Sequence, residues 1–584
     1  MEDVGICIFL LWIMGFLGVA AVCPDLCQCH QDYFVYCRRV SLTDENLRDV
    51  MKEMPPEVRL LDLGSNNLQN ITATIFSHLP NLEYLNLSDN QISSIDEYSF
   101  RYQTMLRDLN LNRNRLMKLN SATFHGLSRL KELDLGSNNI RSIESGAFSE
   151  FTILQQLYLH QNKLDNVSSD MFLGLDNLHL LDLSDNVISV IGDASFRHFK
   201  KLWKLKLNNN QLREIKLESF AGLSSVRELD LSYNHFTSVG FLSTLTFRET
   251  ISAIYLSHNL LKHIPVNLIS TIRRLETLDL SHNYISSVSR DAFFGLSLLT
   301  LNLSSNAFTK IDRGMFSQTR KIMNLDLSFN HIEVVKTGAL DSFRETVYYL
   351  NLHHNKLTEV NPGMFRGMKN LLQLDLDYNN IDNIYEGSFR QLVKLEELRI
   401  SHNKLTTIRD SMLNGPPYQS IHLLDNQIQK FSGFKFEEQN SPIRVHLNLT
   451  AVEQNESSVR VQWPYRDGSQ IYWKVAITCD DGRRKCVTRP QDEYLAPYRM
   501  DAVIEDLSPN SKYYICVYPV FINKNIFVDQ CVHVSTRPSR ALTTVTVKEP
   551  LSKPLGENGC TSLQGVSYSW TMLLIIICVL SWSS

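Results

Sequence analysis

The chain has no surplus of positive charge. Its 58 lysines and arginines are outnumbered by 62 aspartates and glutamates, and its formal net charge is −4. Proteins that bind nucleic acid usually carry a basic surplus, so we predict no nucleic-acid partner. The sequence also has no glycine-rich phosphate loop and no nucleophile elbow. We therefore predict no enzymatic activity and no cofactor.

Cysteine is scarce and unevenly placed. None of the 11 cysteines lies between Cys37 and Cys479. Cys7 belongs to the apolar segment at the start of the chain, and Cys560 and Cys578 lie near its end. The others form two clusters, which is typical of a secreted, oxidised protein. These are Cys23, Cys27, Cys29, Cys37, Cys479, Cys486, Cys516 and Cys531.

The chain begins with an apolar segment that has no leading lysine or arginine. Residues 6–22 read "ICIFLLWIMGFLGVAAV" and end in small residues, although Glu2 and Asp3 precede them. We predict that residues 1–22 are a secretory signal peptide. An uncleaved signal anchor is the alternative interpretation.

No lysine or arginine follows Lys553, yet the chain ends with "WTMLLIIICVLSWSS". Its strongly apolar part would form a helix of roughly 20 Å, whereas a hydrocarbon core is about 30 Å thick. Small residues around Asn558, a polar spacer and a hydrophobic tail follow the order of a glycosylphosphatidylinositol (GPI) attachment signal. We therefore predict lipidation at Asn558, with residues 559–584 removed. A short type I membrane helix is the alternative.

One internal repeat dominates the sequence. The frame L-x-x-L-x-L-x-x-N-x-L occurs in "LEYLNLSDNQI" (82–92), "LKELDLGSNNI" (130–140) and "LLQLDLDYNNI" (371–381). Its asparagines recur at a mean spacing of 24 residues. They are Asn66, Asn90, Asn114, Asn138, Asn162, Asn186, Asn210, Asn234, Asn259, Asn283, Asn306, Asn330, Asn355, Asn379, Asn403 and Asn426. Since no copy can bury its own hydrophobic edge, the copies must stack.

This frame resembles that of extracellular leucine-rich repeat proteins. The resemblance implies an α/β repeat fold, a solenoid of about 16 repeats over residues 56–435. Side chains alternate along a strand, so the two leucines of x-L-x-L-x point inward and the residues between them face outward. The resemblance also implies that each asparagine is structural and bonds the backbone of adjoining turns.

A stack of repeats needs a cap at each end. The segment "CPDLCQCHQDYFVYC" resembles the N-terminal cap of this family, which we place at residues 23–55. The resemblance implies the pairs Cys23–Cys29 and Cys27–Cys37, and a zinc knuckle is the alternative use of these cysteines. The cysteine-rich cap usual at the other end is missing, so another segment must cover the last repeat.

After Asn426 the sequence becomes alternating and β-rich. Residues 442–537 resemble a fibronectin type III domain, on the evidence of Trp463 and the motif from Leu507 to Tyr513. We predict a β-sandwich that docks on the last repeat, followed by a stalk over residues 538–558.

The second cysteine cluster falls in this β-rich region. Cys479 and Cys486 flank an Asp-Gly turn, and Cys516 and Cys531 flank a hairpin tip. We predict that each pair clamps its own hairpin, with long-range crossed pairing as the alternative.

The residues between the inward leucines predict a polar, mildly acidic concave face. Seven are aspartate and only Lys206 and Arg399 are basic, which favours a basic partner. In order they are Asp62, Asn86, Asn110, Asp134, Tyr158, Asp182, Lys206, Asp230, Tyr255, Asp279, Asn302, Asp326, Asn351, Asp375, Arg399 and His422.

Aromatic residues contribute much of the binding energy of interfaces. Our candidate partner-binding residues are therefore Tyr158, Tyr233, Tyr255, His258 and His282, with Tyr233 and Tyr255 expected close together. The histidines suggest two further hypotheses, a metal site and a pH-sensitive surface, but no repeat has metal-ligand spacing.

Sequons for N-glycosylation occur at Asn70, Asn86, Asn166, Asn302, Asn448 and Asn455. Asn86 and Asn302 belong to the concave face, where a sugar would restrict a partner to the repeats between them.

These features predict a recognition or adhesion protein at the outer face of the plasma membrane. It would bind a protein, or a second copy of itself, through its concave face. The alternative is an innate-immune receptor or co-receptor that presents a ligand to a signalling partner. A single-pass type I membrane protein of the same class is a second alternative.

Overall fold

The computed structural model describes residues 23–30, 33–266, 272–423, 425–428 and 430–432, and the strands between 443 and 535. The predicted signal peptide, stalk and C-terminal propeptide lie outside the described residues, as do Cys486, Asn448, Asn455, Trp463 and Asn558. Within the described residues, no helix has the length and apolar character that crossing a bilayer requires.

The N-terminal cap is a small hairpin and one helix. Strands β1 (Gln28–His30) and β2 (Phe34–Tyr36) pair antiparallel, and β2 pairs parallel with the first strand of the solenoid. Disulfides join Cys23 to Cys29 and Cys27 to Cys37, as the resemblance predicted. Helix α2 (Asp44–Glu53) buries Leu47, Val50 and Met51 against the repeats.

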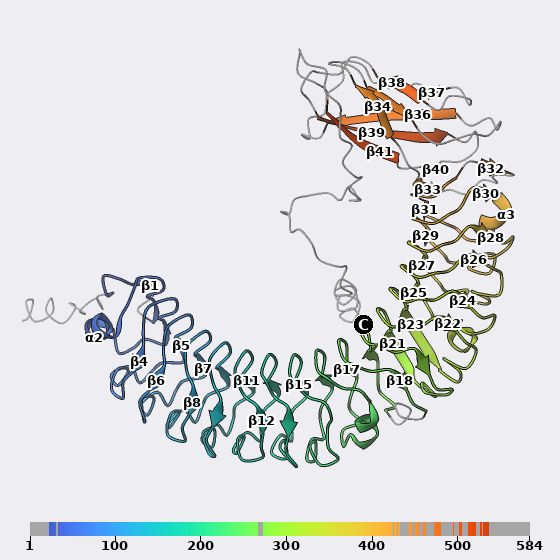
Figure 1. Ribbon diagram of the computed structural model, residues 1–584. Helices are drawn as coiled ribbons and strands as arrows, with labels where there is room; N and C mark the ends of the chain where they lie inside the picture. The colour runs from blue at the N-terminus through green and yellow to red at the C-terminus, as the bar shows by residue number, and fades with distance from the viewer. Residues whose placement is uncertain are drawn as a thin grey trace, which may run out of the picture.

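Strands of successive repeats line the inner side of an arc (Figure 1). Each strand pairs parallel with the next, so every repeat extends one continuous sheet. These strands are β3 (Leu60–Asp62), β5 (Tyr84–Asn86), β7 (Asp108–Asn110), β9 (Glu132–Asp134), β11 (Gln156–Tyr158), β13 (Leu180–Asp182), β15 (Lys204–Lys206), β16 (Glu228–Asp230), β17 (Ala253–Tyr255), β19 (Thr277–Asp279), β21 (Ser297–Asn302), β23 (Lys321–Asp326), β25 (Tyr349–Asn351), β27 (Gln373–Asp375), β29 (Glu397–Arg399) and β31 (Ser420–His422). One strand stands before each repeat asparagine, which agrees with a solenoid of about 16 turns.

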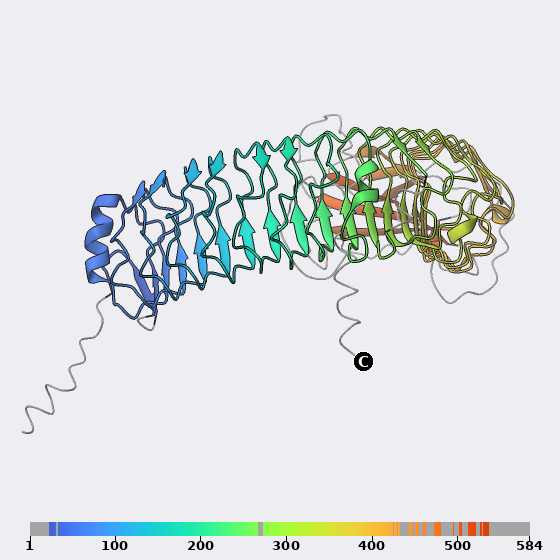
Figure 2. The same ribbon diagram turned by 90° about the horizontal axis from the view of Figure 1, so that it is seen from below.

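The returning arms consist mainly of turns and short parallel strand pairs, visible on the opposite side in Figure 2. The described outer strands are β4 (Asn70–Ile71), β6 (Ser94–Ile95), β8 (Lys118–Leu119), β10 (Ser142–Ile143), β12 (Asn166–Val167), β14 (Val190–Ile191), β18 (His263–Ile264), β20 (Ser287–Val288), β22 (Lys310–Ile311), β24 (Val334–Val335), β26 (Glu359–Val360), β28 (Asn383–Ile384), β30 (Thr407–Arg409) and β32 (Lys430–Ser432). Helical structure in these arms is limited to η1 (Gly240–Thr244), η2 (Asp341–Phe343) and α3 (Asp410–Leu413) in the described residues. The α component of the predicted α/β repeat is therefore small.

Leucines from the strands and phenylalanines from the arms fill the core. Phe76, Phe100, Phe124 and Phe148 are almost fully buried and stack in sequence, with ring centroids 6.2–6.4 Å apart. Truncating such a side chain to alanine usually costs about 3–5 kcal/mol. Each ring contacts the next repeat, so the packing is shared between neighbours.

The repeat asparagines from Asn66 to Asn403 are buried, Asn426 is half-buried, and each bonds the backbone of two turns. Asn186 Nδ2 donates to the carbonyls of Leu159 and Leu183 at 2.9 and 3.1 Å, and its Oδ1 accepts from Leu164 N at 3.0 Å. The residue before each asparagine has a positive φ, from Ser65 at 56° to Asp425 at 51°. The asparagine bonds stabilise this left-handed turn.

The C-terminal strands form two antiparallel sheets. β34 (Thr450–Gln454), β35 (Val459–Gln462) and β38 (Asp501–Ile504) form one sheet. β37 (Tyr494–Leu495), β36 (Tyr472–Cys479), β39 (Lys512–Val520) and β41 (Gln530–Ser535) form the other. Cys516 stands opposite Cys531 in the register of β39 and β41.

The same region extends the sheet of the solenoid. β33 (Ile443–His446) pairs parallel with β31, and β40 (Ile526–Phe527) pairs with β33. The last repeat is therefore continued by strands from this region, consistent with the predicted docking (Figure 1).

Candidate interaction surface of the solenoid

The outward residues of the inner strands form one column, which we call the strand-face column. Parallel pairing aligns Asp62 with Asn86, Asn86 with Asn110, and so on to Arg399 and His422. Because adjacent strands lie about 4.8 Å apart, neighbouring side chains in this column interact electrostatically. The predicted order of the column is confirmed, and its local environments differ.

Acidic groups cluster in and beside the N-terminal part of the strand-face column. Asp108, Glu132 and Asp134 lie on the neighbouring strands β7 and β9. Burial, together with the charges of Glu132 and Asp134, raises the pKa of Asp108 to about 6. Tyr158 stands next to Asp134 in register, is half-buried, and donates its hydroxyl proton to Gln156 Oε1 at 2.6 Å.

Both basic residues of the column are paired with carboxylates. Lys206 Nζ lies 2.9 Å from Asp182 Oδ2, and Arg399 Nε lies 2.7 Å from Glu397 Oε1. A hydrogen bond from His422 is the largest influence that lowers the pKa of Glu397, to about 2. The two positive charges are thus compensated within the protein, and the remaining surface keeps its acidic character.

Tyr255 stands between two half-buried acids in the middle of the strand-face column. Register places it next to Asp230 on one side and Asp279 on the other. Burial raises the pKa of both carboxyl groups, although Ser232 and Ser281 donate hydrogen bonds to them. Burial also raises the pKa of the Tyr255 hydroxyl, which therefore remains protonated and able to donate a hydrogen bond.

The other three candidate residues stack along the edge where the strands end. The ring centroid of Tyr233 lies 3.9 Å from that of His258, and the centroid of His258 lies 4.0 Å from that of His282. In both pairs the ring planes are nearly parallel. All three occupy the left-handed position before a repeat asparagine, with φ of 52°, 54° and 50°. Tyr233 is therefore stacked on histidines in the loop after its strand, whereas Tyr255 belongs to the strand face.

A second stack continues this edge after Ser305, and the sequence analysis did not identify it as a group. Phe329, His354, Tyr378 and His402 follow one another with centroid distances of 4.3, 4.2 and 3.9 Å. We call the two stacks together the aromatic–histidine ladder. The signal that would have revealed it is simple, because every member directly precedes a repeat asparagine.

The ladder combines exposed rings with histidines of lowered pKa. Tyr233, Phe329 and Tyr378 are 51%, 49% and 44% exposed. Burial lowers the pKa of His258, and the neighbouring His282 lowers it further. His354 behaves in the same way beside His353 and His402. The neutral imidazoles therefore stack with their aromatic neighbours at pH 7.

The described sequons fall into two environments. Asn70 and Asn166 are exposed on the outer strands β4 and β12. Asn86 and Asn302 are half-buried in the strand-face column, and Asn86 Nδ2 donates to Asp62 Oδ1 at 2.8 Å. In the described residues, no group of histidine, cysteine and acidic side chains has a geometry suited to a metal ion.

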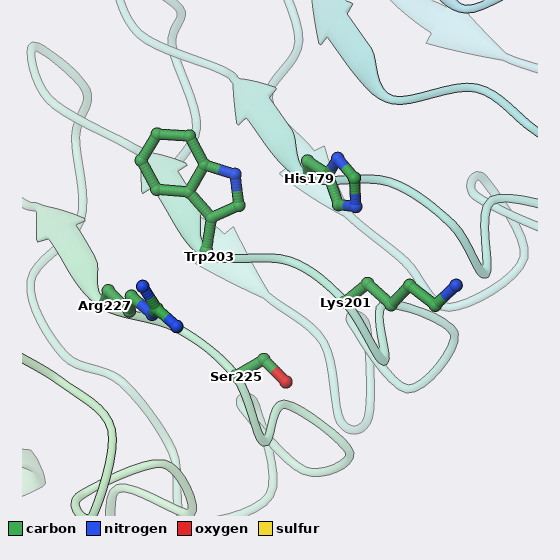
Figure 3. Close-up of a pocket in the computed structure, with 5 residues that line it drawn as sticks. All are labelled: His179, Lys201, Trp203, Ser225 and Arg227. Carbon is green, nitrogen blue, oxygen red and sulfur yellow. The ribbon is translucent and has the colours of Figure 1, made fainter.

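A hollow with a different character lies at the opposite edge, before the strands begin. It is lined by His179, Lys201, Trp203, Ser225 and Arg227 (Figure 3). None of these residues was among the sequence-based candidates. They come from three neighbouring repeats, so the period alone did not reveal that they meet.

The comparisons with known proteins agree with this architecture. The family model described as leucine rich repeat matches residues 56–116, 104–164, 152–212, 176–236, 249–308 and 345–405, more than half of the chain. Among solved structures, the Drosophila Toll–Spatzle complex contains a similar chain, with a TM-score of 0.60 and 24% identity. That likeness covers 69% of this chain and 54% of the other.

Curated relatives are similar over a shorter region. The human leucine-rich repeat-containing protein 3B is 38% identical over 93 residues, 16% of this chain and 34% of the relative. The leucine-rich repeat and immunoglobulin-like domain-containing nogo receptor-interacting protein 1 of Xenopus tropicalis is 36% identical over 94 residues, 16% of this chain. The chain spans only 34% and 15% of the lengths of these two relatives.

Proposed function

Because the chain belongs to the leucine-rich repeat family, we propose that it is a cell-surface recognition protein that binds another protein through its concave face. The observation that carries the proposal is the aromatic–histidine ladder beside the acidic strand-face column. A solenoid offers a long surface whose curvature suits an extended contact. The ladder adds exposed rings, of the residue types that contribute most to binding energy.

Backbone strain supports a role for these rings beyond folding. Left-handed backbone costs about 1 kcal/mol or more for a non-glycine residue and is rare for bulky side chains. Ser65 and Asp89 occupy the same position in the first repeats with small side chains. Tyrosine or phenylalanine at this position is therefore not needed for the turn, whereas an exposed, stacked ring is useful for contact.

Charge indicates which partner surface would fit. Asp230 and Asp279 flank Tyr255, while Lys206 and Arg399 are already paired with acids. A partner with arginine or lysine beside apolar groups would complement this surface, since arginine stacks on aromatic rings and pairs with carboxylates. Toll binds the protein Spatzle in the similar solved structure, and we propose a protein ligand here by analogy of fold.

The test is a binding screen with the full-length protein displayed on non-adherent cells. We expect either aggregation of the cells with one another, which indicates homophilic binding, or capture of an extracellular protein. The double variant Tyr233→Ala/Tyr378→Ala should weaken that binding by about tenfold or more, because two exposed anchor rings are lost. Tyr102→Ala/Tyr385→Ala is the matched control, because both tyrosines are exposed but lie outside the ladder. Equal binding by the two double variants would contradict the proposal.

We further propose, from the residue order alone, that Asn558 carries a GPI anchor and that residues 442–537 form a fibronectin type III-like domain. Release of the protein from cells by phosphatidylinositol-specific phospholipase C tests the anchor. Retention after treatment would favour the type I membrane alternative. Exposure of Asn70 and Asn166 supports glycosylation at these two sites, which glycopeptide mass spectrometry can measure.

A further inference from the structure

The residues directly before the inner strands form a row along one side of the sheet. Backbone hydrogen bonds join the members of this row. His179 N donates to Gln155 O at 2.8 Å, Trp203 N to His179 O at 3.0 Å, and Arg227 N to Trp203 O at 2.8 Å. Each step is one strand spacing of about 4.8 Å. The backbone therefore holds His179, Trp203 and Arg227 side by side at a constant interval.

The side chains of His179, Trp203 and Arg227 border the hollow shown in Figure 3, together with those of Lys201 and Ser225. Trp203 is 42% exposed, so part of its indole ring faces solvent at the hollow. Lys201 and Arg227 are exposed beside it, and His179 and Ser225 are half-buried. The hollow thus combines one exposed indole ring with several hydrogen-bond donors.

Its cations lack the acidic partners that neighbouring lysines have. Lys200, Lys204 and Lys206 are paired with Asp176, Glu228 and Asp182 at 3.0, 2.7 and 2.9 Å. Lys201 Nζ instead donates to the neutral Asn177 Oδ1 at 2.7 Å. Within the described part of the chain, Arg227 has no carboxylate in ion-pair contact. The positive charge of Lys201 and Arg227 is therefore available to a ligand.

We propose that this hollow binds an anionic saccharide, a polysaccharide segment that carries sulfate groups. The exposed face of Trp203 offers an apolar surface for the C–H face of a pyranose ring. The ammonium of Lys201 and the guanidinium of Arg227 would donate charge-assisted hydrogen bonds to sulfate oxygens on either side of it. Arg129 and Lys131 are exposed farther along the same edge and would extend the contact of a longer chain.

A saccharide fits this site better than the other polyanions. The disulfides Cys23–Cys29 and Cys27–Cys37 are typical of oxidising compartments and the cell exterior, where sulfated glycans are abundant. A nucleic acid would need stacking partners for successive bases, whereas Trp203 is the single aromatic residue among the five that line the hollow apart from the imidazole of His179. An acidic peptide would use the cations but would gain less from the indole face.

This site is separate from the surface of the proposed function. The aromatic–histidine ladder follows the strands, whereas His179, Trp203 and Arg227 precede them. In a parallel sheet, residues that precede the strands and residues that follow them lie at opposite ends of the strands. The two proposals rest on different residues, so failure of one leaves the other intact.

The test is binding of full-length protein, purified in mild detergent, to an immobilised heparin oligosaccharide. We expect Lys201→Ser/Arg227→Ser to weaken binding by at least tenfold, since the variant loses two charge-assisted hydrogen bonds to sulfate. Lys163→Ser/Arg213→Ser removes the same charge from exposed positions elsewhere and should bind as the unchanged protein does. Equal loss in both variants would indicate nonspecific electrostatic attraction and would overturn the proposal.

A second variant tests the contact with the sugar ring. Trp203→Ala should weaken heparin binding severalfold while leaving any binding of poly-L-glutamate unchanged. Leu217→Ala is the matched control, because Leu217 is 65% exposed and lies outside the hollow. Poly-L-glutamate or single-stranded RNA that binds at the hollow more tightly than heparin would overturn the saccharide assignment in favour of that polyanion. Retained thermal stability of each variant would establish that the loss is local.

Discussion

At the scale of single residues, the repeat asparagines stabilise the turns, whose conformation the leucines alone do not specify. Each amide bonds the backbone of its own turn and of the preceding one, and the bonds of Asn186 and Asn138 are almost identical in length. The asparagine therefore joins local chain geometry to the stacking of repeats.

Replacing one of these asparagines should be costly. Asn186→Ala would leave the buried amide of Leu164 without its partner. It would also remove one of the two side-chain amides that bond each of the carbonyls of Leu159 and Leu183. We expect the unfolding free energy to fall by about 2 kcal/mol, since an unsatisfied buried group costs roughly 1–3 kcal/mol. Chemical denaturation measures the change. Asn81→Ala, which removes one exposed hydrogen bond to Pro56, should cost less than about 1 kcal/mol.

Asp108 illustrates how a single carboxylate can oppose folding at neutral pH. Burial raises its pKa to about 6, whereas an unfolded aspartate titrates near 3.8. The folded state therefore binds more protons between these values, and the contribution of this group to stability falls as the pH rises from about 4 to about 6. The charges of Glu132 and Asp134 act in the same direction.

We accordingly expect Asp108→Asn to be more stable than the unchanged protein at pH 7. The gain should be about 1 kcal/mol after allowance for solvent screening of this partly exposed group, and it should disappear near pH 4. Thermal melts of both proteins across this range give the measurement. A variant that is less stable at pH 7 would show that the ionised carboxylate of Asp108 does not destabilise the folded protein.

At the scale of elements, the ladder couples neighbouring repeats through stacked rings. His258 lies between Tyr233 and His282, and His354 lies between Phe329 and Tyr378. Burial lowers the pKa of both histidines, so their neutral forms stabilise the folded protein above the unfolded pKa of about 6.5. That stabilisation is lost as the pH falls through the lower folded pKa.

Acidification should therefore loosen these repeats. We expect the protection of the backbone amides at β16 to β19 and at β23 to β27 to be lower at pH 5 than at pH 7, once the intrinsic slowing of hydrogen exchange at lower pH has been corrected for. His258→Phe/His354→Phe keeps the rings but cannot be protonated, so its exchange should change less. If both proteins respond alike, the ladder does not sense pH, and other acids must explain any change.

At the scale of the whole molecule, both ends of the sheet are continued by other structure. The disulfide-linked hairpin and α2 cover the first repeat, and β33 and β40 extend the sheet beyond β31. An uncovered end of a stack exposes core and unpaired backbone groups. We expect the pairing of β33 with β31 to stabilise the last repeats, where a cysteine-rich cap is missing.

Interrupting this junction should affect one end of the molecule only. Val445 pairs with Ile421 across β33 and β31, and proline at 445 would remove a backbone donor and restrict φ. We expect Val445→Pro to increase hydrogen exchange in β29 and β31, by at least tenfold, which corresponds to about 1.4 kcal/mol. β5 to β11 serve as the internal control and should not change. Unchanged exchange at β31 would mean that the docking contributes little stability.

The pairing of the capping disulfides followed from the family resemblance, whereas the amino-acid sequence by itself determined the period, the core and the order of the strand-face column. These depend on contacts within a repeat or between adjacent copies, and such contacts recur wherever the leucines and asparagines recur. Tyr158 and Tyr255 could therefore be assigned to the column from alternation alone. The sequence also placed Tyr233, Tyr255, His258 and His282 in one group, whereas the structure stacks Tyr233 on the two histidines and leaves Tyr255 on the strand face.

Only the tertiary structure decided how these residues meet. The left-handed position aligns Phe329 with His354 and Tyr378, and the backbone row brings Trp203 beside Arg227. The raised pKa of Asp108 likewise depends on burial beside Glu132 and Asp134. Residues about 24 positions apart contact one another because parallel strands stack in register. A periodic pattern gives this interval, but it does not show which side chains lie along the same side of the sheet, stack their rings or interact electrostatically.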